Sequence, residues 1–164
     1  MELNTRGRYA VMAMADLARQ GGEHAVPLSQ ISDRQRITVA YLEQLFQQLR
    51  RAGLVDSARG RAGGYKLARA ARSITVAEVM AAVDEGTRMT RCMGLQGETC
   101  MAGESGERCL THNLWEALGE EIATFLGRIS LQDVIDGLPG RAPGEAPRAP
   151  GEQAWADASP DGVR

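Results

Sequence analysis

Apolar side chains in the first third of the chain recur with the spacing of short helices. They run almost unbroken over residues 9–18, which predicts a buried helix ended by the glycines at residues 21 and 22. A second, shorter helix is expected within residues 28–37, with Ser29 placed to cap it.

The most regular pattern follows Thr38, which is expected to cap a third helix that ends at Gly53. The apolar stripe of this helix consists of Val39, Leu42, Leu45, Phe46 and Leu49. Two strand-like arms come next, Leu54–Ser57 and Tyr65–Leu67, around a loop rich in glycine and arginine. Three helices followed by a β-hairpin predict a winged helix-turn-helix, so the fold class is mainly α with a small β part (α+β).

The second half of the chain begins with a capping box, Thr75 with Glu78, ahead of a short apolar helix. After a polar loop, a long amphipathic helix is predicted, and a short last helix follows with Ser130 as its cap. The seam of the long helix is narrow enough to pair with a second copy, although packing against its own domain is the alternative. The residues expected to join two chains are Leu114, Leu118, Ile122, Phe125 and Ile129.

The pattern divides the chain into three parts. Residues 1–75 are expected to form the winged helix-turn-helix, and residues 76–137 the polar loop with the dimerisation helices. Residues 138–164 carry five of the six prolines and are expected to be a disordered tail, since they cannot bury enough apolar surface to offset their ordering entropy.

The net charge also differs between the two halves of the chain. Residues 1–75 hold 12 Arg and Lys against 6 Asp and Glu, whereas residues 76–164 hold 7 against 15. A basic first half next to an acidic second half predicts that only the first half meets a polyanion. The apolar runs are too short for a membrane span, so we expect a cytoplasmic protein without a membrane partner.

The third helix and the hairpin carry the side chains that could read DNA. Glutamine can contact adenine, arginine can hold guanine or phosphate, and glutamate can accept from the cytosine amino group. An arginine tip on the hairpin suits the narrow minor groove, and arginines at the start of the first helix suit phosphates. The alternative is an ordinary solvated surface. The expected DNA contacts are Thr38, Tyr41, Glu43, Gln44, Gln48 and Arg50 on the third helix, Arg59 and Arg61 on the hairpin, and Arg6 and Arg8 on the first helix.

Residues 92–112 hold all three cysteines and a histidine in the pattern C-x7-C-x8-C-x2-H. An odd number of cysteines argues against a disulfide framework. Catalysis is disfavoured because no oxyanion hole or pocket signature accompanies the thiols, so no enzyme is predicted. Spacing alone leaves a zinc site and an iron–sulfur cluster equally open. The candidate ligands are Cys92, Cys100, Cys109 and His112.

Four stretches together resemble the IscR-like regulators of iron–sulfur cluster assembly, within the Rrf-type winged-helix family. They read RGRYAVMAMADLA, YLEQLFQQLRRAGLVDSARGRAGGY, VAEVMAAVDE and RCMG with CLTHNLW. The resemblance implies a [2Fe–2S] cluster on the four candidate ligands, received from the iron–sulfur assembly machinery. It also implies a homodimer joined through a helix at about residues 112–128, and operator DNA as the partner.

Members of this subgroup repress cluster assembly genes when the cluster is bound, and the resemblance implies that Glu43 makes DNA choice depend on the cluster. This chain departs from the subgroup in its longer spacings between cysteines, in the RGRAGGY loop, and in Ala40 where a polar residue is common. The alternative function is a winged-helix regulator that holds a structural zinc or senses oxidants directly through its thiols.

Overall fold

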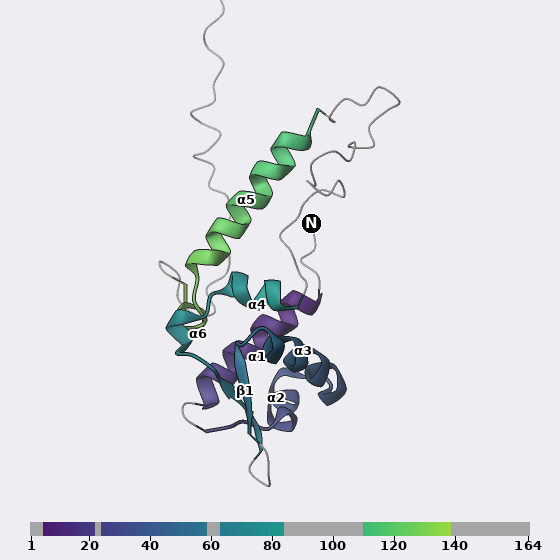
Figure 1. Cartoon of the computed structure of the whole chain (residues 1–164), viewed down its shortest axis with the longest axis vertical. Coiled ribbons are helices and arrows are strands. Elements are labelled where there is room, and N and C mark those ends of the chain that lie inside the picture. The colour runs from purple at the N-terminus through teal and green to yellow at the C-terminus, as the bar shows by residue number, and fades with distance from the viewer. Residues whose placement is uncertain (1–4, 22–23, 59–62, 84–109, 139–164) are drawn as a thin grey trace, which may run out of the picture.

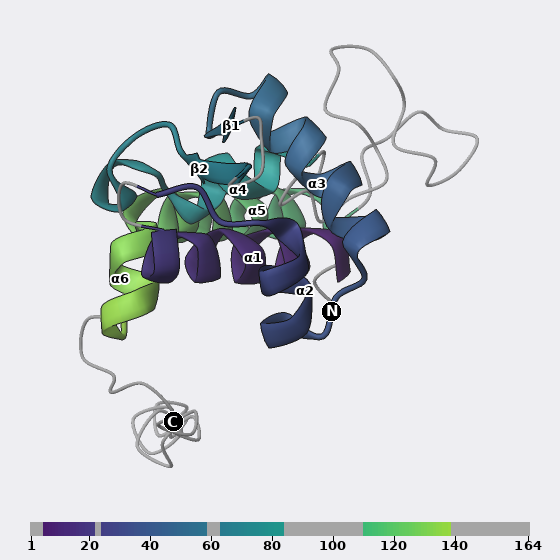
Figure 2. The ribbon, with the colours of Figure 1, turned by 90° about the horizontal axis from the view of Figure 1, so that it is seen from below.

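The computed structural model describes residues 5–21, 24–58, 63–83 and 110–138 of the chain. Three helices are followed by an antiparallel hairpin and then by further helices (Figures 1 and 2). This order confirms the predicted mainly helical, winged helix-turn-helix fold. The elements are α1 (Thr5–Gly21), α2 (Leu28–Gln35), α3 (Val39–Arg51), β1 (Val55–Ala58), β2 (Gly64–Leu67), η1 (Ala71–Ser73), α4 (Val76–Ala82), α5 (His112–Arg128) and α6 (Leu131–Asp136).

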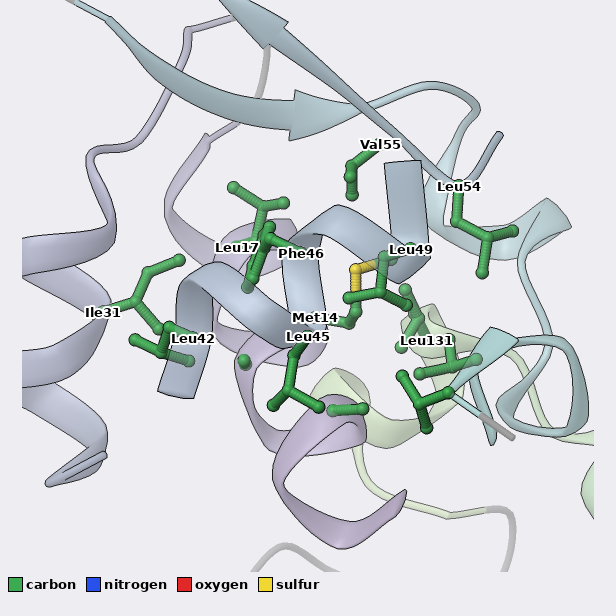
Figure 3. Close-up of a cluster of buried hydrophobic side chains, with 14 of the residues drawn as sticks. Met14, Leu17, Ile31, Leu42, Leu45, Phe46, Leu49, Leu54, Val55 and Leu131 are labelled. Atoms are coloured by element: carbon green, nitrogen blue, oxygen red, sulfur yellow. The ribbon is translucent and has the colours of Figure 1, made fainter. Parts of the chain in front are cut away.

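One apolar core joins the winged helix to the helices that follow it. α1 contacts α2, α3, α4 and α6, and it lies in front of α4 and α5 in Figure 2. Met12 is 37% exposed, so the expectation that the middle of α1 is buried all round was wrong. Because side chains from both sides of residue 75 share this core, α4 and α6 pack on the winged helix. Its fully buried members include Ile74, Val79 and Val83, together with Met14, Leu17, Ile31, Leu42, Phe46 and Leu131, which are labelled in Figure 3.

α3 begins and ends at the residues that the sequence predicts. Thr38 is the N-cap residue, and its side chain accepts a hydrogen bond from the Tyr41 amide at 3.4 Å. At the other end Gly53 adopts φ 71°, and its amide donates to the carbonyl of Arg50. The amide of Leu54 reaches back to the carbonyl of Leu49, which completes a Schellman motif. The helix therefore stops where the hairpin must begin.

The hairpin pairs Val55 with Leu67 at its base and Ala58 with Gly64 toward its tip. Tyr65 is also bridged on its other side, because its amide and carbonyl bond to those of Val26. This brings the backbone ahead of α2 against β2 at Gly64, where a Cβ would lie 2.7 Å from the nitrogen of Pro27. Glycine is needed there because no side chain fits between the two backbones.

α2 is fixed to α1 by a buried carboxylate. Asp16 is 7% exposed and accepts hydrogen bonds from Arg34, at 2.7 Å to Nη2, and from Gln35 at 3.1 Å. The helix begins after Pro27 without a side-chain cap, so the expectation that Ser29 caps it was wrong. Proline presets the φ angle at this boundary, which lets the helix start one residue ahead of the serine.

The N-termini of α4 and α6 lie against each other. Thr75 and Ser130 bridge, with the amide of Val76 donating to the Ile129 carbonyl and the amide of Leu131 to the Ile74 carbonyl. Each helix starts with a complete capping box, formed by Thr75 with Glu78 and by Ser130 with Asp133. Both predicted caps are confirmed, and the paired backbone bonds attach the end of α5 to the start of α4.

α5 rises from the upper end of the body in Figure 1, opposite the tip of the hairpin. It contacts α4, yet most of its large apolar side chains are exposed, from 37% at Leu118 to 60% at Leu114. Leu131, three residues beyond its end, is fully buried. The helix therefore meets the core at its C-terminal end and leaves its apolar face uncovered. Within the described ranges, no helix is long and apolar enough to cross a membrane.

We predict that Arg36→Gly stabilises the protein. Arg36 follows α2 with φ 57° and ψ 35°, and among the described residues it is the only non-glycine with a positive φ. The left-handed conformation strains a residue with a Cβ, so relief should raise the free energy of unfolding by about 0.5–1 kcal/mol. Urea unfolding followed by circular dichroism measures this. Arg36→Ala is the control, because it removes the charge and keeps the Cβ; equal stability of the two variants would contradict the argument.

A second prediction concerns acid. The backbone amide of Thr75, followed by the Arg69 guanidinium 2.9 Å away, lowers the pKa of Glu78 below its usual value. The stability from this carboxylate is present above its unfolded pKa and is lost as the pH falls through its lower folded pKa. Glu78→Gln should therefore cost less than about 1 kcal/mol at pH 7, since the pair is half-exposed.

The difference between Glu78→Gln and the parent should shrink in melting curves recorded from pH 7 down to pH 3. Glu120→Gln, which removes an exposed carboxylate of α5, tests whether any change of charge has the same effect. A constant difference between Glu78→Gln and the parent at every pH would contradict the assignment.

Candidate DNA interface and cluster ligand

The inner face of α3 determines which of its side chains face solvent. Leu42, Leu45, Phe46 and Leu49 are at most 1% exposed and gather with Met14 and Leu17 of α1 (Figure 3). Val39 was expected in this stripe but is 38% exposed, because it occupies the first turn, ahead of the packed segment.

The side chains exposed on α3 form a polar stripe at helical spacing. Thr38, Glu43, Gln44 and Arg50 are exposed as a DNA contact requires. Tyr41 and Gln48 are half-buried, and the Tyr41 ring packs edge-on against Tyr9 of α1, with 5.9 Å between ring centroids. The outward face is thus rotated from the one expected. We define the recognition stripe as Ala40, Glu43, Gln44, Gln47 and Arg51, all of them exposed.

Gln47 and Arg51 are exposed on α3 but were not among the expected DNA contacts. The spacing of the apolar residues contains the signal for both, since Gln47 lies one turn beyond Glu43. Tyr41 made this signal ambiguous, because a tyrosine at the edge of an apolar stripe can face solvent or pack against another ring.

The hairpin stands beside the C-terminal end of α3. Arg50 Nη1 donates to Ser57 Oγ on β1 at 3.4 Å, so this arginine spans from the helix to the wing. Arg6 and Arg8 are exposed on the first turn of α1. Arg59 and Arg61 lie outside the described residues. Among the described residues, the arginines expected to contact DNA therefore lie on α1 and α3, and Arg50 connects α3 to the hairpin.

Of the four candidate cluster ligands, the structure describes His112. It is the first residue of α5, and it is the one buried residue of this helix, with 8% of its surface exposed. Its Nε2 atom lies 3.9 Å from Oε2 of Glu116, one turn along the helix. Cys92, Cys100 and Cys109 lie outside the described residues, within which no three His, Cys, Asp or Glu side chains are grouped to hold a metal.

The donors fit an iron–sulfur cluster by their chemistry. Thiolates are the usual ligands of such clusters, and imidazole can replace thiolate on one iron. A carboxylate next to a ligating imidazole fixes the orientation of its ring, and Glu116 is placed for this role.

Comparison with known proteins agrees with this fold. The family profile of Rrf2, described as iron-dependent transcriptional regulator, matches residues 3–137. The HTH-type transcriptional regulator IscR of Xenorhabdus nematophila is 53% identical over 135 residues, covering 82% of this chain and 79% of the relative. The protein of the same name from Photorhabdus laumondii is 47% identical and covers 94% of each chain.

Two solved structures share the architecture. T. potens IscR superposes with a TM-score of 0.65 at 34% identity and covers 83% of this chain and 87% of its own. CymR, the global cysteine regulator of B. subtilis, gives 0.66 at 29% identity and covers 83% and 97%. With a family match across most of its length and relatives near half identity, the chain belongs to the Rrf2 family of transcriptional regulators.

Proposed function

We propose that the chain is a [2Fe–2S]-sensing repressor of iron–sulfur cluster assembly genes that acts in the cytoplasm as a homodimer on operator DNA. Cys92, Cys100, Cys109 and His112 would hold the cluster, which the assembly machinery would supply. The position of His112 carries the proposal: it is buried at the first residue of α5, three residues after Cys109. The names of the relatives, HTH-type transcriptional regulator IscR, agree with it.

Within this proposal, each half of the chain has one task. The recognition stripe on α3 contacts base edges in the major groove, and Arg6, Arg8 and the wing arginines Arg59 and Arg61 contact phosphates and the minor groove. Glu43 selects among sequences, because a carboxylate at base edges is favourable next to a cytosine amino group and repelled elsewhere. The bound cluster supplies a connection between the cysteine loop and α5 that depends on iron and oxidants.

The structure also connects the proposed cluster ligand His112 to the DNA-binding unit. His112 begins α5, and the backbone bonds between Ile129 and Val76 and between Leu131 and Ile74 attach the other end of α5 to α4. α4 packs on α1 within the winged-helix core. A ligand that fixes His112 therefore acts on a helix that is anchored to the DNA-binding unit.

We predict that His112→Ala lowers cluster retention and leaves the fold intact. The parent, purified without oxygen, should be red-brown with about two iron and two sulfide per chain. The variant should lose most of that iron, while its circular dichroism spectrum and elution volume stay unchanged. His24→Ala is the matched control, because the chain has two histidines and His24 is exposed on the segment between α1 and α2.

Affinity for an operator duplex, measured with and without the cluster, then tests the function. A colourless parent with about one zinc per chain would overturn the cluster and support the structural zinc instead. A coloured parent that binds the operator with the same affinity with and without the cluster would contradict the proposed sensing of the cluster.

We also predict that Leu118→Glu separates the dimer. The expected dimer residues Leu114, Leu118 and Phe125 are exposed on α5, Ile122 is half-buried, and Ile129 follows the helix end. Burying a glutamate between two copies leaves a desolvated charge without a partner, so the variant should elute as a monomer. It should also lose at least tenfold in affinity for a two-half-site operator, since the second half-site no longer adds to binding.

Ala123→Glu is the control for this change. It adds the same charge at an exposed position away from the apolar face, and it should remain dimeric. Equal elution volumes for Leu118→Glu and the parent would place the dimer contact elsewhere.

A further inference from the structure

We propose that Gln47 is a specificity-determining residue that reads an adenine in each half of the operator, in the place where the sequence pattern suggested Gln48. Gln47 is exposed on α3, whereas its neighbour Gln48 is half-buried. The inference rests on the proposed function, because it requires the recognition stripe of α3 to lie in the major groove.

The two glutamines differ through the packing of the helix. Gln48 precedes Leu49, which is fully buried, and stands one helical turn from Leu45, which is 1% exposed. Gln47 instead follows Glu43 by four residues and Gln44 by three, so the three side chains project from one face. A base edge that meets Glu43 and Gln44 therefore has Gln47 as its next neighbour along the helix.

α3 cannot roll to exchange the two. Tyr41 is packed on Tyr9 at one end, and Arg50 donates to Ser57 of the wing at the other. A roll by one residue would also withdraw Leu42 and Leu49 from the core, and exposing a fully buried leucine costs several times the energy of one hydrogen bond. The outward direction of Gln47 is thus set by contacts that the free protein already makes.

Chemistry identifies the ligand. The glutamine amide offers one donor and one acceptor, which match the N7 acceptor and the N6 amino donor of adenine in the major groove. No ion pair or hydrogen bond within the described residues engages the Gln47 side chain, so both groups are available. Arg51, one turn farther along the same stripe, is placed to meet a phosphate as the helix leaves the groove.

The test is selection of duplexes from a randomised library by the full-length protein, in the parent and in Gln44→Ala, Gln47→Ala and Gln48→Ala. Gln47→Ala should lose about tenfold of preference for adenine at one base pair in each half-site and keep the rest of the operator. Gln48→Ala is the matched control, and its selected sequence should equal the parent's.

The outcomes distinguish a failure of the role of Gln47 from a failure of the proposed α3 interface. If Gln44→Ala changes the selected sequence and Gln47→Ala does not, this inference fails while the α3 interface stands. If neither changes it, the proposed interface itself fails. If Gln48→Ala relaxes the adenine and Gln47→Ala does not, the assignment of the outward face is overturned.

Two further measurements distinguish base reading from contact with phosphate. Replacing the selected adenine with 7-deazaadenine removes the N7 acceptor, so the parent should lose affinity while Gln47→Ala is indifferent to the replacement. Gln47→Glu should shift the preference at that position toward cytosine, whose amino group donates to a carboxylate. A uniform loss of affinity on every duplex would show a phosphate contact and overturn the inference.

Discussion

The burial of one face of α3 is the constraint on which the DNA-binding unit depends. The centre of the core is occupied by Leu42, Leu45, Phe46 and Leu49. Apolar packing therefore sets the rotation of the helix about its axis in the free protein. The polar stripe is what remains outside, and its register follows from the core alone. Mutations inside the core would therefore change operator choice by changing the orientation of the recognition stripe, even though the mutated residues contact no base.

A second constraint sits where α5 meets the body. Ser130 and Thr75 cap two helices that start side by side, and hydrogen bonds from Val76 and Leu131 close the junction. The same junction lies next to the wing, because Arg69, two residues after β2, pairs with Glu78 of the Thr75 capping box. The junction therefore connects the end of α5 to α4 and to the base of the wing.

The local parts of this fold could be predicted from sequence, and the contacts between distant segments could not. Thr38, Gly53, the Thr75–Glu78 capping box and the Ser130 cap signal helix ends within four residues of chain, and all four are found. The half-burial of Tyr41 depends on Tyr9, which lies 32 positions earlier, so the pattern of α3 alone could not show it. Gly64 and Arg36 are similar cases, since their backbone requirements arise from the path of the chain around α2. The three cysteines of the candidate site remain a sequence prediction, supported by the position of His112.

The separation of the two sites within one chain has a thermodynamic consequence. If the cluster favours the arrangement of winged helices that fits an operator, operator DNA must favour cluster retention by the same factor. Under the proposed function this arrangement belongs to the dimer, in which the exposed face of α5 would set the distance between the two recognition stripes once a second copy covered it. His112 at one end of α5 and the capped junction at the other then bias the same rigid element. A coupling of tenfold corresponds to about 1.4 kcal/mol. That is comparable to one or two hydrogen bonds, so the contacts of a single ligand such as His112 would be of the right size to supply a tenfold change in operator affinity.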